Sequence, residues 1–163
     1  AAPAARGAAM RRFDLRSLRF HGAGEVRRTL PVEVAPFVFG GLEYHVPGDV
    51  VDATLTAARV GDNLTLTLLV ETAVTGPCQR CLADADVPVT ARGLEYVRHG
   101  ESEGDDEDEG YVTAHVVDLE AWTRDLVADA LPSKLLCREE CRGLCPLCGA
   151  DLNADPDHTH EEA

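Results

Sequence analysis

Long hydrophobic runs are missing from this sequence of 163 residues, and lysine occurs only once, at Lys134. No stretch reaches the roughly eighteen apolar residues that a membrane-spanning helix needs, so we expect no membrane partner. Residues 1–9 are small and lack the apolar core of a signal peptide, and Met10 is a candidate for the natural start. We therefore expect a cytoplasmic protein.

The sequence also lacks the motifs that usually accompany catalysis. It contains no phosphate-binding glycine loop, no nucleophile elbow and no pair of carboxylates at a credible site. Four histidines are scattered singly, which is more typical of surface or core positions than of general bases: His21, His45, His99 and His115. These absences predict a protein that is not an enzyme and has no small-molecule substrate.

Basic residues are few and unevenly placed. The chain holds 15 basic and 29 acidic side chains, yet residues 1–28 contain seven arginines against Asp14 and Glu25. A protein that follows a phosphate backbone needs a basic surface, and the remaining residues would repel one. Only the arginine-rich start could touch RNA directly, and an ordinary solvated segment explains that start equally well.

Alternating apolar residues predict antiparallel hairpins. Residues 51–57 and 64–70 both alternate with period two, and Gly61-Asp62-Asn63 supplies a turn between them. Residues 25–34 read as a further strand. Alternation resumes at residues 87–91, so we expect the pair Cys78 and Cys81 at the tip of a second hairpin.

One helix is expected at residues 118–131. Asp118 can cap its start, apolar side chains including Trp122 recur at helical spacing, and Pro132 ends it. The fold class is therefore α+β, with mostly antiparallel hairpins, one C-terminal helix and a cysteine-rich zinc-knuckle tail. We expect three regions: a basic, partly disordered arm (1–24), a β-rich core with an acidic loop at 99–110 (25–136), and a metal-binding segment (137–163).

All six cysteines lie in two clusters. Four share a C-x3-C-x3-C-x2-C spacing at Cys137, Cys141, Cys145 and Cys148, and two form the pair Cys78 and Cys81. Closely spaced thiolates converge on one ion, and a glycine after the last cysteine permits the turn beneath it. A disulfide framework fits less well, because the chain is long enough to bury a core. We predict a closed, structural zinc site rather than a catalytic one.

Spacing alone leaves the ligand set open. The favoured set is the local one, with Cys137, Cys141, Cys145 and Cys148 closing a short loop at small entropic cost. The second set joins Cys78 and Cys81 to Cys145 and Cys148 in the manner of a zinc ribbon. His158 and His160 could complete a mixed site, although a His-x-His in a polar tail is usually solvated.

The order of these motifs resembles the YceD family, the large ribosomal RNA subunit accumulation proteins, in the form typical of high-GC Gram-positive bacteria. The likeness covers about residues 11–162. It rests on the hairpin with Cys78-Gln-Arg-Cys81-Leu, the acidic run, and the helix that ends in Leu-Pro. It also rests on the C-x3-C-x3-C-P-x-C-G-x-x-L-N block and the Pro-Asp-His-x-His tail, and the family's two cysteine blocks match all six cysteines.

The resemblance implies a small cytoplasmic non-enzyme that supports synthesis, processing or stability of large-subunit ribosomal RNA. We expect it to hold a basic ribosomal protein or assembly factor through its acidic surface, with at most weak or indirect contact with ribosomal RNA. One alternative is a zinc-dependent RNA-binding module that uses the N-terminal arginines. Another is a thiol redox protein that uses Cys78 and Cys81.

Overall fold

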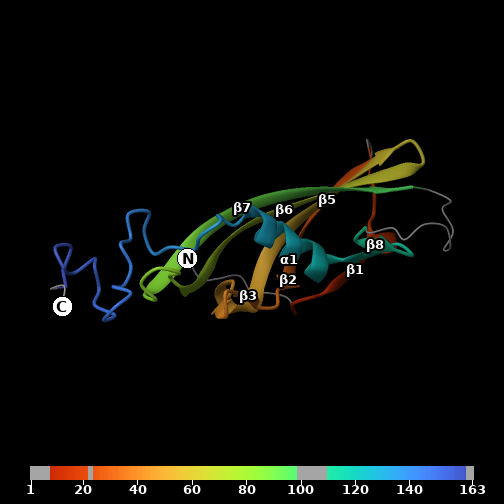
Figure 1. The fold of residues 1–163 in the computed structure, drawn as a ribbon. Coiled ribbons are helices and arrows are strands. Elements are labelled where there is room, and N and C mark those ends of the chain that lie inside the picture. Colours follow the sequence, from red (N-terminus) through yellow and green to blue (C-terminus); the bar gives the residue numbers. More distant parts are fainter. Residues whose placement is uncertain (1–7, 22–23, 99–109, 161–163) are drawn as a thin grey trace, which may run out of the picture.

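The computed structural model describes residues 8–21, 24–98 and 110–160. Its largest element is a long antiparallel sheet with the strand order β2-β5-β6-β7 (Figure 1). These strands are β2 (Glu25–Glu33), β5 (Val50–Val60), β6 (Asn63–Pro77) and β7 (Asp84–Val97). Both predicted hairpins are confirmed, since β5 pairs with β6 and β6 pairs with β7.

Two smaller sheets and one helix complete the described fold. One sheet has the order β1-β9-β8 and the other pairs β3 with β4. Their bounds are β1 (Arg12–Asp14), β3 (Phe37–Phe39), β4 (Leu42–Tyr44), β8 (Val112–Thr113) and β9 (Val116–Asp118). Short 3₁₀ turns lie at Leu15–Ser17 and Pro47–Asp49, and α1 spans Leu119–Ala130. None of the described helices has the length and apolarity to cross a bilayer.

The core lies between α1 and one face of the sheet (Figure 1). Asp118 caps the helix as expected, accepting a hydrogen bond from the backbone N–H of Ala121 at 3.0 Å. Trp122 is buried and packs over Gly93 of β7, where a Cβ atom would lie 2.5 Å from the indole nitrogen. This tryptophan therefore anchors the helix on the sheet.

The start of the described chain is part of this core. β1 pairs with β9, and the 3₁₀ turn at Leu15–Ser17 follows it directly, so the segment contains a short strand and a helical turn. Leu15 and Leu18 are buried beneath it. The predicted acidic loop at 99–110 falls, apart from Gly110, outside the described residues.

The β3–β4 hairpin braces the end of β6 that leads to the cysteines. Tyr44 is buried against Gly76, and its hydroxyl donates a hydrogen bond to the carbonyl of Pro77 at 2.9 Å. His45 also exchanges backbone hydrogen bonds with Thr75. The strand therefore reaches Cys78 in a fixed direction, and the tip of the β6–β7 hairpin projects beyond the core toward the C-terminal segment (Figure 1).

Candidate metal sites

The tip of the β6–β7 hairpin brings its two cysteines to one side. The backbone N–H of Cys78 donates to the carbonyl of Ala83 at 2.7 Å, and the N–H of Leu82 donates to the carbonyl of Cys78 at 2.9 Å. Leu82 takes the left-handed conformation that closes the turn, with φ of 62°. This geometry follows from the C-x2-C spacing, which leaves two residues to reverse the chain between the thiols.

The segment after α1 docks on this tip through backbone and side-chain hydrogen bonds. The N–H of Gln79 donates to the carbonyl of Leu135 at 2.9 Å, and the N–H of Leu135 donates to the Gln79 side-chain oxygen at 3.2 Å. The Arg80 guanidinium donates to the carbonyl of Cys141 at 2.6 Å. These contacts fix the position of Cys137 and Cys141 against the hairpin.

The result is a first group of four thiols, from Cys78, Cys81, Cys137 and Cys141, which we call the four-cysteine group. Its sulfur atoms all lie within 4.8 Å of one another. The Cys78 and Cys141 sulfurs are 3.8 Å apart, and those of Cys81 and Cys137 are 3.6 Å apart. Cys78 and Cys141 are buried, and the other two are half-buried. All six cysteines of the chain are free thiols.

Backbone dipoles make one of these thiols acidic. Burial raises the pKa of Cys78, but N–H groups of Cys137, Arg80 and Cys81 that point at its sulfur outweigh burial and lower the pKa to about 6. Burial and the neighbouring sulfurs raise the pKa of Cys137 to about 12. The group therefore accommodates one thiolate readily and resists several unless a cation neutralises them.

A second group combines two thiols with two imidazoles. Cys145, Cys148, His158 and His160 each offer one donor atom within 4.8 Å of the others, and we call them the Cys2His2 group. The Cys145 sulfur lies 3.1 Å from Nε2 of His160, and the Cys148 sulfur lies 3.2 Å from Nε2 of His158. The two Nε2 atoms are 3.2 Å apart. Cys145 is buried, whereas Cys148 and His160 are exposed.

A compact loop holds the Cys2His2 group. The N–H of Gly149 donates to the carbonyl of Cys145, and the N–H of Cys145 donates to the carbonyl of Ala150, both at 2.8 Å. Gly149 has φ of 75°, which confirms the turn expected there. The N–H of Cys148 and the imidazole of His160 lower the pKa of Cys145 to about 6.

A carboxylate stands behind one of the imidazoles. Nδ1 of His158 lies 3.6 Å from the Asp155 carboxylate, while its Nε2 faces Cys148. Carboxylates in this position behind a metal-binding histidine fix its tautomer and raise its basicity. The arrangement orients His158 for donation through Nε2, which is the atom directed at the other three donors.

The two groups are joined to each other. The Asn153 side chain donates to the sulfur of Cys141 at 3.6 Å and accepts from the backbone N–H of Arg142 at 2.8 Å. Gly143 passes the hairpin so closely that a Cβ there would meet the Arg80 carbonyl oxygen at 2.8 Å, and its φ is 81°. Only glycine fits this crossing without strain.

Both groups have the donor chemistry of tetrahedral zinc sites. Zn–S bonds of about 2.3 Å and Zn–N bonds of about 2.0 Å correspond to S···S separations of about 3.8 Å and N···N separations of about 3.3 Å. The four-cysteine group matches the first value, and the His158–His160 pair matches the second. The S···N distances are a few tenths of an ångström short of the tetrahedral spacing of about 3.6 Å, so a zinc ion would widen the Cys2His2 group slightly.

The structure divides the four cysteines that the sequence analysis grouped. Cys137 and Cys141 lie with Cys78 and Cys81, whereas Cys145 and Cys148 lie with the two tail histidines. The ribbon-like pairing of Cys78 and Cys81 with Cys145 and Cys148 is not among the groups that the described residues form. That these residues bind a metal remains a prediction from their chemistry and placement.

Similarity to known proteins supports the family resemblance that the motifs indicate. The family model "Large ribosomal RNA subunit accumulation protein YceD" matches residues 66–163, which include every member of both groups. Uncharacterized proteins of Mycobacterium tuberculosis and Mycobacterium bovis are 34% identical over 119 residues, or 71% of this chain and 58% of their own length. A Mycobacterium leprae protein, also uncharacterized, is 34% identical over 58% of the chain and 47% of its own length.

The chain thus spans about half the length of these curated relatives. No solved structure matches it. The matched residues run from near the start of β6 through the hairpin tip and α1 to the tail, so they carry the donor groups together with the elements that position them. On the family match, this chain belongs to the YceD family of large ribosomal RNA subunit accumulation proteins.

Proposed function

We propose that this protein is a cytoplasmic, non-enzymatic factor that binds two structural zinc ions and supports the accumulation of large-subunit ribosomal RNA during early ribosome assembly. The observation that carries the metal part is the presence of two complete sets of four donors, each brought together by its own hydrogen bonds. The family match carries the ribosomal part.

Zinc fits these groups better than other common metals. Four thiolates, or two thiolates with two imidazoles, are the donor sets of closed tetrahedral zinc sites, whereas Mg²⁺ and Ca²⁺ require oxygen donors. A set of four protein donors leaves no position for a substrate or an activated water. The ions would therefore serve the fold, in that the four-cysteine group links the sheet to the tail and the Cys2His2 group shapes the tail.

The acidic surface supports a basic protein partner. The formal charge of the chain is −14, and outside residues 1–28 acidic side chains outnumber basic ones by 27 to eight. Ribosomal proteins and other factors that bind ribosomal RNA carry the opposite charge, and complementary charge steers such partners together. We infer that the protein holds one of them until it is delivered to, or protected on, the large-subunit RNA.

Metal content per chain tests the zinc proposal directly. Elemental analysis of protein purified under reducing conditions should give two zinc ions for the wild type. The variants Cys78→Ser/Cys81→Ser and His158→Asn/His160→Asn should each give one, because each removes half of one donor set. Metal-free wild-type protein with a disulfide between Cys78 and Cys81 would instead support the redox alternative, for which the acidic Cys78 thiol is suited.

Affinity capture tests the partner. Tagged wild-type protein should retain a large-subunit ribosomal protein or a basic assembly factor from lysate treated with ribonuclease. A tagged acidic protein of similar size and charge serves as the control for general attraction. Recovery of RNA alone from untreated lysate, with no such protein after ribonuclease, would contradict the proposed mechanism.

A further inference from the structure

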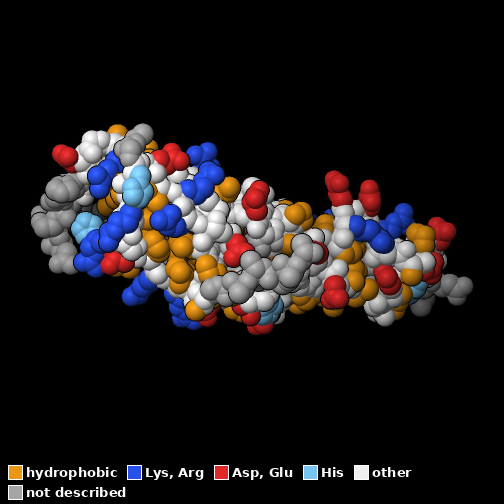
Figure 2. Space-filling model, turned by 180° about the vertical axis from the view of Figure 1, so that it is seen from behind, with side chains coloured by type: hydrophobic (Ala, Val, Ile, Leu, Met, Phe, Trp, Pro, Cys, Tyr) orange, Lys and Arg blue, Asp and Glu red, His pale blue; other side chains and the backbone are white. Residues whose placement is uncertain are grey.

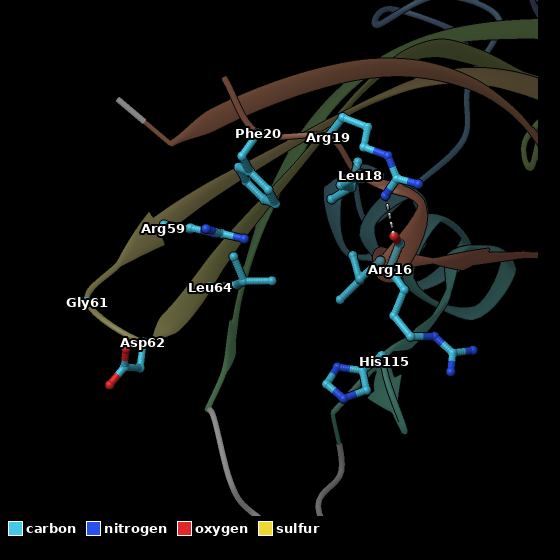
Figure 3. A pocket seen from close by; sticks show the side chains of 10 residues that line it. Arg16, Leu18, Arg19, Phe20, Arg59, Gly61, Asp62, Leu64 and His115 are labelled. Atoms are coloured by element: carbon cyan, nitrogen blue, oxygen red, sulfur yellow. Dashed lines mark hydrogen bonds between the residues drawn. The ribbon is translucent and has the colours of Figure 1, made fainter. Parts of the chain in front are cut away.

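Basic side chains gather at one end of the molecule (Figure 2). The cysteine-rich tail lies at the opposite end (Figure 1). A cavity of about 480 Å³ opens at the basic end. It lies between the 3₁₀ turn at Leu15–Ser17 with its flanking residues, the β5–β6 turn and the β8–β9 turn. Figure 3 shows the side chains that surround it. Three arginines and one histidine line this cavity, which is unusual for a chain with a formal charge of −14: Arg16, Arg19, Arg59 and His115.

Apolar side chains form part of the cavity wall, beside the arginines. Leu15 and Leu18 line the cavity and are largely buried. Leu64 of β6 lies across from Leu18 (Figure 3). Phe20 closes one side, and the guanidinium of Arg59 lies over its ring at 4.5 Å from the centroid. Cation–π contact of this kind holds the arginine in place without neutralising it.

Two of the arginines have charge to offer a ligand. Among the described residues, neither Arg19 nor Arg59 forms an ion pair with a carboxylate, and Arg19 donates only to the carbonyl of Arg16 at 3.2 Å. Arg16 is different, because its guanidinium is held in a fork by the Asp14 carboxylate at 2.7–3.1 Å. Within the described residues, the positive charge at the rim that no carboxylate pairs is therefore carried mainly by Arg19 and Arg59.

His115 is held at the cavity by a strained turn. Ala114 and His115 form the β8–β9 turn with φ of 49° and 67°, a conformation that residues other than glycine rarely adopt. The carbonyl of His115 accepts a hydrogen bond from the N–H of Leu15 at 2.9 Å. Such strain persists only where the surroundings enforce it and is concentrated at binding sites.

We propose that this cavity binds a segment of single-stranded RNA. An unstacked nucleobase would lie against Leu18, Phe20 and Leu64, and the adjacent phosphates would contact Arg19, Arg59 and His115. Apolar or aromatic surfaces for bases beside arginines for phosphates are the general means of binding single strands. An acidic peptide fits less well, because its carboxylates would occupy the arginines but would supply no nucleobase for the apolar side chains of Leu18, Phe20 and Leu64.

The proposal goes beyond the function proposed above and depends on neither the zinc ions nor the protein partner. It differs from binding by an N-terminal arm, because Arg59 comes from the end of β5 and His115 from the β8–β9 turn, both far along the chain. It would let one molecule hold a basic protein on its acidic surface and the RNA at its other end. Ribosomal RNA is the RNA to which the family name points.

Fluorescence anisotropy with a labelled single-stranded RNA dodecamer tests this site. Arg19→Gln/Arg59→Gln should weaken binding by about tenfold or more, since each charged hydrogen bond lost contributes an appreciable share of the affinity. The salt dependence of log Kd should become less steep by about 1.4, or about 0.7 for each phosphate contact. Arg27→Gln/Arg92→Gln is the matched control, with the same change of charge on the outer face of the sheet.

Zinc content and circular dichroism establish that each variant is folded. Arg59→Lys is a further variant, which keeps the positive charge but loses the planar guanidinium group. A control variant that weakens binding as much as the cavity variant would overturn the proposal in favour of general charge attraction. So would absence of binding by the wild type at 50 mM salt, or equal competition by poly-glutamate. Because zinc content is measured on the same samples, failure of this site is distinguishable from failure of the proposed zinc sites.

Discussion

The four-cysteine group and the Cys2His2 group are neighbours in space but are built over very different lengths of chain. In the first, the paired cysteines are 56 and 63 residues apart, whereas in the second the paired donors are ten and 15 residues apart. The first joins a hairpin of the main sheet to the segment after the helix. The second organises a single loop. The four-cysteine group therefore connects distant parts of the fold, and the Cys2His2 group organises the tail alone.

The two groups also differ in how deeply their donor residues are buried. Cys78 and Cys141 are buried and form a small cluster with Ala85, while Cys148 and His160 are exposed. A buried thiolate needs compensation by a cation or by hydrogen bonds, whereas an exposed donor can be solvated. The comparison indicates that a metal at the first group stabilises the whole fold, and that a metal at the second stabilises local structure.

Removal of the metal should have the largest effect. With a strong chelator under reducing conditions, we expect the amides of residues 135–160 to lose most of their protection from hydrogen exchange. The reason is that this segment has few backbone hydrogen bonds and no strand longer than an isolated bridge. The amides of β5 and β6 should lose much less protection, because the main core excludes the cysteine groups. Unchanged protection of the tail, measured by mass spectrometry, would show that metal does not hold it.

Single serine substitutions should separate the two groups. Cys141→Ser places a hydroxyl in a buried site and breaks the link between sheet and tail, so we expect Tm to fall by about 5–10 °C. Cys148→Ser is the matched change in the exposed group and should lower Tm by less than about 2 °C. Differential scanning calorimetry checks both values. Equal shifts would remove the distinction between a global and a local group.

Glycine substitutions sharpen the comparison without touching a donor atom. Gly143→Ala and Gly149→Ala both force alanine into the left-handed region, which costs about 1 kcal/mol. Only Gly143→Ala also drives a Cβ against the Arg80 carbonyl, whereas nothing lies within 4 Å at Gly149. Urea unfolding should therefore show an additional loss of about 1 kcal/mol for Gly143→Ala. Identical losses would mean that the crossing at Arg80 relaxes freely.

The smallest effect is expected at the carboxylate behind His158. Asp155→Asn should weaken zinc retention by the Cys2His2 group about tenfold, because the imidazole loses its orienting charge. Competition with a chromophoric chelator measures this change, and the four-cysteine group should be unaffected. Asp157→Asn removes the same charge two residues away and should have no effect. A loss of equal size in both variants would indicate general electrostatics rather than orientation.

The sequence was sufficient for the elements that carry their own signal. Strict alternation predicts β5 and β6, because each strand has one buried face, and Asp118 with Pro132 bounds the helix. The N-terminal segment was less predictable, since Leu15 and Leu18 are buried only because β1 pairs with β9, more than a hundred residues away in the chain. Local patterns do not encode such a pairing.

The cysteines could be identified from their spacing, but their grouping could not. Any two C-x2-C or C-x3-C pairs satisfy the same tetrahedral geometry, so spacing does not choose between partners. The choice is made by Gln79 and Arg80, whose hydrogen bonds bring Leu135 and Cys141 to the hairpin. The basic cavity was equally hidden, because Arg59 and His115 are far apart in the sequence and nothing local marks them as neighbours.

The long reach of the four-cysteine group has a consequence for the order in which the chain matures during synthesis. Cys78 and Cys81 leave the ribosome early, but Cys137 and Cys141 are made only after every described strand and the helix. The sheet can thus form first, with two free thiols at its tip, and the proposed metal would be bound last. Until then the hairpin tip remains open to oxidants and chaperones, so the supply of metal would decide how long each new molecule stays immature.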